Sequence, residues 1–134
     1  MSPPPKTRVL FVCIGNSCRS QMAEGFARAY GSDVMTPASA GLAPAVSVAH
    51  DTVRVMDEKN IDIRGQFPKS LQHLSRTPFD LIVNMSGFEL PRDITTPARE
   101  WDVQDPIGED FETYRQVRDQ IEGLVMRLIL ELRR

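Results

Sequence analysis

Short apolar runs rich in strand-forming residues alternate with longer helix-forming segments along this chain. We predict strands at residues 8–13, 34–40, 79–85 and 99–103. We predict helices at residues 20–30, 46–60, 69–74 and 111–132. Strands that alternate with helices build a parallel sheet with helices on both of its faces. The sequence therefore predicts a three-layer α/β fold.

The length of 134 residues is typical of one compact domain. We place this domain at residues 8–134, after a proline-containing tail at residues 1–7 that we expect to be disordered. The 16 basic and 18 acidic residues form no run of like charges, so we expect no nucleic-acid or membrane partner. The N-terminal segment lacks the apolar core of a secretory signal. We therefore expect a cytoplasmic protein whose two cysteines stay reduced.

The first predicted strand runs into a loop that begins at Cys13 and ends at Arg19, where a helix follows. Such a loop points backbone N–H groups inward, and the helix dipole adds positive charge, so a tetrahedral oxyanion can bind there. Gly15 permits the tight turn, and Asn16 tolerates a left-handed backbone. The planar guanidinium of Arg19 can donate to two oxygens of the anion.

The same positive field favours the ionised form of the Cys13 side chain. A thiolate at a helix N-terminus beside a guanidinium is populated at neutral pH. It can attack a phosphorus or arsenic atom that is held above it. Ser20 is a candidate for two roles, as the N-cap of the helix and as a donor to the Cys13 sulfur.

The stretch V-C-x-G-N-S-C-R-S-x-M-A-E-x-F resembles the active-site loop of the low-molecular-weight protein tyrosine phosphatases. It is equally similar to that of the arsenate reductases with the same fold. The resemblance continues at residues 39–41, 60–63, 79–85 and 105–121. It implies a flavodoxin-like, four-stranded parallel sheet with strand order 2-1-3-4. It also implies that Cys13 is the nucleophile and Arg19 the oxyanion ligand. The implied oxyanion-binding loop and its supporting residues are Ile14, Gly15, Asn16, Ser17, Cys18, Ser20 and Ser39.

Asp105 is the predicted general acid, because a leaving oxygen on phosphorus needs a proton donor. It follows a predicted strand and precedes Pro106, and ligand-site residues gather at the carboxyl ends of parallel strands. The resemblance strengthens this assignment, since the family's acid lies in such an Asp-Pro pair. Asp102 and Asp110 are weaker candidates. The two histidines, His50 and His73, have no motif around them, so we expect surface or packing roles.

Two activities compete, and a third possibility is a sensor that binds oxyanions without turnover. Hydrolysis of phosphotyrosine or a small aryl phosphate requires only Cys13, Arg19 and Asp105, so we favour a phosphatase. The alternative is an arsenate reductase, which Gln21 favours because the resembling phosphatases more often carry proline there. Reductases that draw on thioredoxin have further cysteines after the third strand, where this chain has Ser86. Arsenate reduction would therefore rely on Cys18 or on an external thiol or redoxin.

Two further expectations concern cofactors and redox chemistry. No group of His, Cys and Asp residues has zinc-like spacing, so we expect neither a metal nor another cofactor. Cys18 is a candidate to trap oxidised Cys13 in a reversible disulfide. The simpler interpretation, that Cys18 only fills space beneath the loop, stays open. Ile107 and Gly108 follow the Asp-Pro pair, where eukaryotic members of the resembling family carry tyrosines, so the sequence favours a small aryl phosphate over a tightly bound phosphopeptide.

Overall fold

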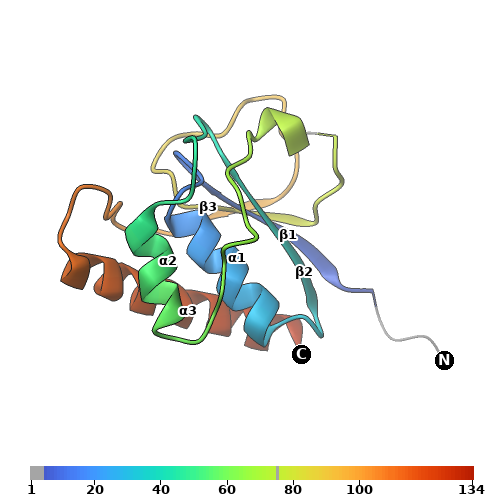
Figure 1. Ribbon diagram of the computed structural model, residues 1–134. Coiled ribbons are helices and arrows are strands. Elements are labelled where there is room, and N and C mark those ends of the chain that lie inside the picture. Colours follow the sequence, from blue (N-terminus) through green and yellow to red (C-terminus); the bar gives the residue numbers. More distant parts are fainter. Residues whose placement is uncertain (1–4, 75) are drawn as a thin grey trace.

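A four-stranded parallel sheet forms the centre of the computed structural model, which describes residues 5–74 and 76–134 (Figure 1). The strands lie in the order β2-β1-β3-β4, which confirms the predicted order 2-1-3-4. Their bounds are β1 Thr7–Cys13, β2 Met35–Gly41, β3 Leu81–Asn84 and β4 Ala98–Glu100. Alternate side chains of β1 point to opposite faces, so both faces of this central strand are buried.

Three α-helices pack together on one face of the sheet, and Figure 1 shows them on the same side. They are α1 Arg19–Tyr30, α2 His50–Asp57 and α3 Phe111–Leu132. The opposite face is covered by the 3₁₀-helix η1, Gln72–Leu74, and by connecting segments. The fold class is therefore confirmed, with helical turns on both faces. The layer on this opposite face covers a smaller apolar cluster than the α-helices do. The buried members of this cluster are Leu10, Val12, Ala40, Leu71 and Ile82.

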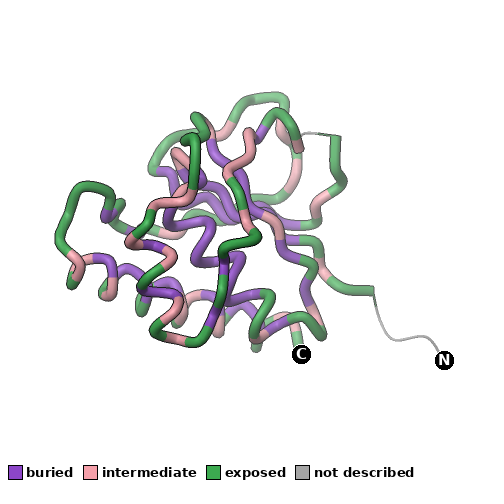
Figure 2. Tube along the Cα trace, viewed as in Figure 1, coloured by how far each residue is buried: buried purple, intermediate pink, exposed green. Residues whose placement is uncertain are grey.

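The amphipathic C-terminal helix lies where its pattern predicts. Its apolar side chains belong to the larger core cluster, and Figure 2 shows α3 buried along the side that faces the sheet. The buried members are Tyr114, Val117, Ile121, Val125, Leu128 and Ile129. Within the described ranges, no helix has both the length and the apolar character needed to cross a membrane.

Several predicted boundaries differ from those observed. Helix α1 begins at Arg19 with Cys18 as its N-cap, so an N-cap role for Ser20 is wrong. Strand β1 begins at Thr7, which pairs with Met35, one residue before the predicted start of the domain. Residues 1–4 of the predicted tail lie outside the described residues. Residues 46–49 and 58–60 do not continue α2, and β3 and β4 are shorter than predicted.

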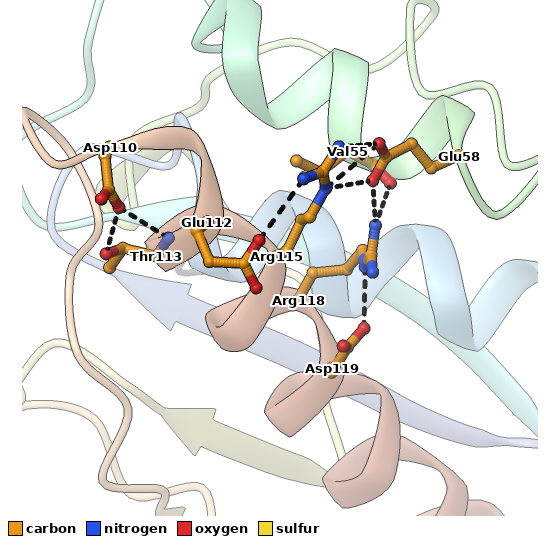
Figure 3. A network of polar contacts seen from close by, with 8 residues as sticks. All are labelled: Val55, Glu58, Asp110, Glu112, Thr113, Arg115, Arg118 and Asp119. Carbon is orange, nitrogen blue, oxygen red and sulfur yellow. Dashed lines mark hydrogen bonds and ion pairs between the residues drawn. The ribbon is translucent and has the colours of Figure 1, made fainter.

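A polar network joins α2 to the first turns of α3 (Figure 3). The guanidinium of Arg118 is buried, and it donates to the Val55 carbonyl at 3.0 Å and to Glu58 at 2.6 Å. Arg115 binds the same carboxylate at 2.7 Å. Hydrogen bonds from Arg115 are the main reason that the pKa of Glu58 falls to about 2. The network holds α2 in place at the end of the sheet that carries the loop.

Candidate active site

The loop of residues 14–18 connects the carboxyl end of β1 to α1, and each of its backbone carbonyls accepts a hydrogen bond. The carbonyls of Ile14, Gly15 and Ser17 accept hydrogen bonds from the segment that follows β2. Those of Asn16 and Cys18 accept from the first turn of α1. No group in residues 5–74 and 76–134 accepts a hydrogen bond from the N–H groups of residues 14–18. This division leaves a row of backbone N–H donors of the kind that binds an oxyanion.

Close packing against β2 shapes the loop. The backbone of Asn16 is left-handed, with φ of 49°, a conformation that asparagine tolerates. Gly41, the last residue of β2, lies directly beneath the loop. A Cβ at this position would stand 2.6 Å from the Ile14 carbonyl oxygen and 2.9 Å from the Asn16 nitrogen. Gly41 is therefore required for space, a role that sequence reasoning missed.

A chain of hydrogen bonds ends on the sulfur of Cys13. The Lys69 N–H donates to Asn16 Oδ1 at 2.8 Å, and Asn16 Nδ2 donates to Ser20 Oγ at 2.7 Å. Ser20 Oγ lies 2.9 Å from Cys13 Sγ. Ser20 Oγ accepts from Asn16, and its own proton is available to donate to the sulfur. This is the arrangement that stabilises a thiolate.

The side chain of Arg19 is buried and held at one end. Its Nη1 donates to the carbonyl of Met85 at 2.5 Å and to that of Val103 at 3.0 Å. These carbonyls follow β3 and β4, so the guanidinium spans the carboxyl edge of the sheet. Its Nη2 lies 3.6 Å from Asp105 Oδ2. Anchoring through Nη1 leaves the Nε–Nη2 edge for a bidentate contact with an anion.

Asp105 is the acidic residue that the fold brings to this guanidinium. Its side chain is 43% exposed, and Oδ1 accepts the Ile107 N–H at 3.1 Å, which fixes the turn after the Asp-Pro pair. Asp110 instead caps α3 by accepting the Thr113 N–H at 2.9 Å. Both histidines, His50 and His73, are exposed. The site residues predicted as nucleophile, oxyanion ligand and acid therefore come from segments that meet at one edge of the sheet.

The second cysteine, Cys18, is as buried as the first. Both are free thiols, and each is only 2% exposed. Burial raises the pKa of Cys18 to about 12, and the Thr52 hydroxyl on α2 lowers it less. Cys18 is therefore a protonated, poorly nucleophilic thiol at neutral pH. The disulfide with Cys13 stays a prediction.

Gln21 and Ser39 form supporting hydrogen bonds that the sequence did not predict. Gln21 is fully buried, and its Nε2 donates to the carbonyls of Asn16 at 2.9 Å and Phe67 at 3.1 Å. Gln21 thereby connects the loop to the segment after α2. A glutamine at this position does not by itself predict such a contact. Ser39 donates to Glu24 at 2.6 Å. Ser39 thus joins β2 to α1, and it supports the loop only through that helix.

A cavity of about 590 Å³ lies at the same edge, beside Arg19. Its lining comes from the ends of β3 and β4 and the residues that follow them. The polar and charged members are Arg19, Asn84, Ser86, Glu100 and Asp102. Trp101 also lines it and packs on Phe11, with ring centroids 5.9 Å apart. Phe88, which follows β3, is 61% exposed and does not belong to the core.

Comparisons with known proteins agree with this geometry. The family model described as low molecular weight phosphotyrosine protein phosphatase matches residues 8–134. The glutaredoxin arsenate reductase of Synechocystis is 36% identical over 93% of this chain and 98% of its own length. A solved arsenate reductase in the phosphate binding state is 33% identical, with a TM-score of 0.86 over 94% of this chain and 98% of that one. The low molecular weight protein tyrosine phosphatase from T. tengcongensis is 30% identical, with a TM-score of 0.78 and 94% and 99% coverage.

These relatives bear on the two competing activities. The sequence and the structure are both more similar to these reductases than to the tyrosine phosphatase. The phosphatase that we favoured from the sequence is therefore not confirmed, and its reductase alternative is better supported.

Proposed function

The chain belongs to the low molecular weight phosphotyrosine protein phosphatase family, and we propose that within this family it is an arsenate reductase. The observation that carries this proposal is the similarity to a glutaredoxin arsenate reductase, 36% identical over 93% of this chain. The site supports it because arsenate, like phosphate, is a tetrahedral oxyanion that matches the row of loop N–H donors.

The first step joins arsenate to Cys13. The loop N–H groups and the free edge of Arg19 hold the arsenate oxygens, and the Cys13 thiolate attacks arsenic. A sulfur–arsenic bond forms and an arsenic–oxygen bond breaks. The departing oxygen takes a proton from Asp105 and leaves as water, in a general-acid step. Ser20 steadies the thiolate through its hydroxyl at 2.9 Å.

The second step needs a reductant from outside the chain. The only other cysteine, Cys18, is buried and stays protonated at neutral pH, so it is a poor internal nucleophile. An external thiolate attacks Cys13 Sγ, so a sulfur–sulfur bond forms and the sulfur–arsenic bond breaks. The electron pair of that bond goes to arsenic, which leaves as arsenite. A second thiolate then attacks the mixed disulfide, regenerates the Cys13 thiolate and carries away the oxidised donor.

Phosphate-ester hydrolysis is the second candidate function, favoured by the position of Asp105 beside Arg19. In that reaction Cys13 attacks phosphorus, Asp105 protonates the leaving oxygen, and water releases phosphate from the phosphocysteine. The residues after the Asp-Pro pair, Ile107 and Gly108, are exposed and provide no aromatic ring to grip a phosphotyrosine. A small aryl phosphate is therefore the fitting substrate for this activity.

One paired assay separates these functions. The protein is incubated with arsenate plus a thiol donor, and separately with an aryl phosphate, beside the variants Cys13→Ser and Asp105→Asn. Arsenite formation that needs Cys13, with hydrolysis far slower, supports the proposal. Hydrolysis that needs Cys13 and falls with Asp105→Asn, without arsenite formation, selects the phosphatase. Arsenate binding without either product selects the sensor.

A further inference from the structure

We propose that Gln21 is a positioning residue of the oxyanion loop, which holds the Asn16–Ser17 peptide so that the Ser17 N–H points at the bound anion. This inference rests on the proposed function, because arsenate reduction begins with arsenate on the loop donors. Gln21 is fully buried and acts through the backbone of the loop. It therefore sets how tightly the loop binds an oxyanion.

The direction of each loop N–H follows from the carbonyl of the preceding residue. The peptide bonds of the loop are trans, so the C=O and the N–H of one peptide unit point in opposite directions. A carbonyl that is hydrogen-bonded away from the centre of the loop therefore directs the next N–H toward that centre. The partners of the five carbonyls decide which N–H groups can reach an anion.

Four of the five carbonyls of residues 14–18 accept from backbone N–H groups, and one accepts from a side chain. The exception is Asn16, whose carbonyl accepts from Gln21 Nε2 at 2.9 Å. Asn16 is also the loop residue with the left-handed backbone. Within this loop, the Ser17 N–H is therefore the donor whose direction depends on a side chain.

The side-chain amide of Gln21 is fixed in one orientation. Its Nε2 donates to the Asn16 and Phe67 carbonyls at 2.9 and 3.1 Å, and its Oε1 accepts from Gln66 Nε2 at 2.8 Å. Gln66 Nε2 also lies 3.1 Å from the backbone carbonyl of Gln21, to which it donates. The reverse orientation of the amide would place its oxygen against two carbonyl oxygens, which repel it. Gln66 thus fixes the amide group that fixes the loop.

The segment that carries Phe67 is itself attached to the loop and to β2. The Lys69 N–H donates to Asn16 Oδ1 at 2.8 Å, and the Lys69 carbonyl accepts from the Gly41 N–H at 2.8 Å. If Gln21 loses its amide, the Asn16 carbonyl loses its partner and the Asn16–Ser17 peptide can rotate. A rotated peptide turns a carbonyl oxygen toward the anion in place of an N–H. The loop then loses one hydrogen bond to the anion and gains a repulsive contact.

The first test measures the binding of sulfate to the variant Gln21→Leu, which keeps a side chain of similar size and removes the donor. Sulfate is the probe because it is a tetrahedral oxyanion that stays a dianion near neutral pH. Its dissociation constant should rise at least about tenfold, as expected for the loss of one hydrogen bond to a charged group. Gln116→Leu is the matched control, because Gln116 is exposed on α3, and sulfate binding should not change.

Amide NMR spectra distinguish a positioning role from general support of the fold. In the wild-type protein, sulfate should shift the amide protons of Gly15, Asn16 and Ser17. In Gln21→Leu the shift of Ser17 should be lost, whereas those of Gly15 and Asn16 persist, because the carbonyls that precede them keep their backbone partners. Equal loss of all three shifts, or a wild-type shift of Ser17, would overturn the proposal.

The variant Gln21→Glu adds a reversible form of the same test. At about pH 8 its carboxylate cannot donate to the Asn16 carbonyl, so sulfate should bind at least about tenfold more weakly than to the wild type. Burial raises the pKa of a glutamate, so at about pH 5 the protonated side chain donates again. Affinity relative to the wild type should then recover in Gln21→Glu and not in Gln21→Leu. A ratio that does not change with pH would contradict the proposal.

Arsenate turnover separates this inference from the proposed function. If sulfate binding behaves as described but no thiol donor yields arsenite, the role of Gln21 stands and the proposed function fails. If arsenite forms, and Gln21→Leu keeps both the wild-type KM for arsenate and the sulfate shift of Ser17, the function stands and the role of Gln21 is overturned.

Discussion

Replacing Gly41 by alanine tests whether the β2 contact positions the oxyanion loop. The added Cβ would lie 2.6 Å from the Ile14 carbonyl oxygen, whereas ordinary contact begins at 3.4 Å. The Ile14 carbonyl oxygen is a backbone atom, so no flexible side chain can move aside to make room. The loop backbone must therefore move by about 0.8 Å. A misplacement of about 1 Å in a reacting group can cost about 100-fold in rate. Overpacking of this kind also destabilises a fold by ~1–3 kcal/mol.

We therefore expect Gly41→Ala to lower kcat/KM for arsenate reduction by about 10- to 100-fold in a protein that still folds. The assay follows arsenite formation and, separately, the rise in melting temperature that phosphate produces, which reports anion binding without chemistry. Gly65→Ala is the matched control, because no atom lies within 4 Å of its added Cβ. Gly41→Ala with wild-type turnover and wild-type phosphate binding would refute the argument that this contact shapes the loop.

Three further variants test other parts of the structure. Arg19→Lys loses the planar fork that contacts two carbonyls, so phosphate should bind at least about tenfold more weakly in thermal-shift titrations; unchanged affinity would contradict the role of Arg19. Glu58→Gln should lower the melting temperature at pH 7. Because the pKa of Glu58 is lowered from 4.5 to about 2, its stabilisation is present above about pH 4.5 and lost towards pH 2. The two melting curves should therefore converge there, and a gap that persists at pH 2 would count against the network. Gly123→Ala, in the exposed interior of α3 with no atom within 4 Å, should stabilise the protein by about 1 kcal/mol in chemical denaturation, and a loss of stability would show an unrecognised contact.

Local features of the site were predictable because they lie within a few residues of one another. Cys13, Asn16 and Arg19 belong to a single strand–loop–helix unit, and loop conformation and helix polarity follow from short-range spacing. The alternation of strands and helices likewise predicted the parallel sheet. The structure excluded the cap role of Ser20 and placed its hydroxyl 2.9 Å from Cys13 Sγ. The sequence alone did not separate these roles, because a helix cap and a donor to sulfur require the same residue type.

The comparison of the two activities shows a different limit. Residues 13–19 resemble both phosphatases and arsenate reductases, because both reactions begin with a thiolate that attacks a bound tetrahedral anion. The loop alone therefore does not choose between them. Arsenate reduction needs a second thiol, whereas hydrolysis of a phosphate ester needs only water. Whether this chain can supply that thiol itself depends on the environment of Cys18, which does not follow from a short stretch of sequence.

The amino-acid sequence by itself determined the sheet, the loop between β1 and α1 and the C-terminal helix, because each follows from short-range pattern. The tertiary structure decided which distant groups complete the site. Strand order placed the Met85 and Val103 carbonyls around Arg19 and brought Lys69 to Asn16. Burial beneath α2 raises the pKa of Cys18, and the ends of β3 and β4 leave a cavity open beside Arg19. These features depend on contacts between residues far apart in the chain, which local propensity does not encode.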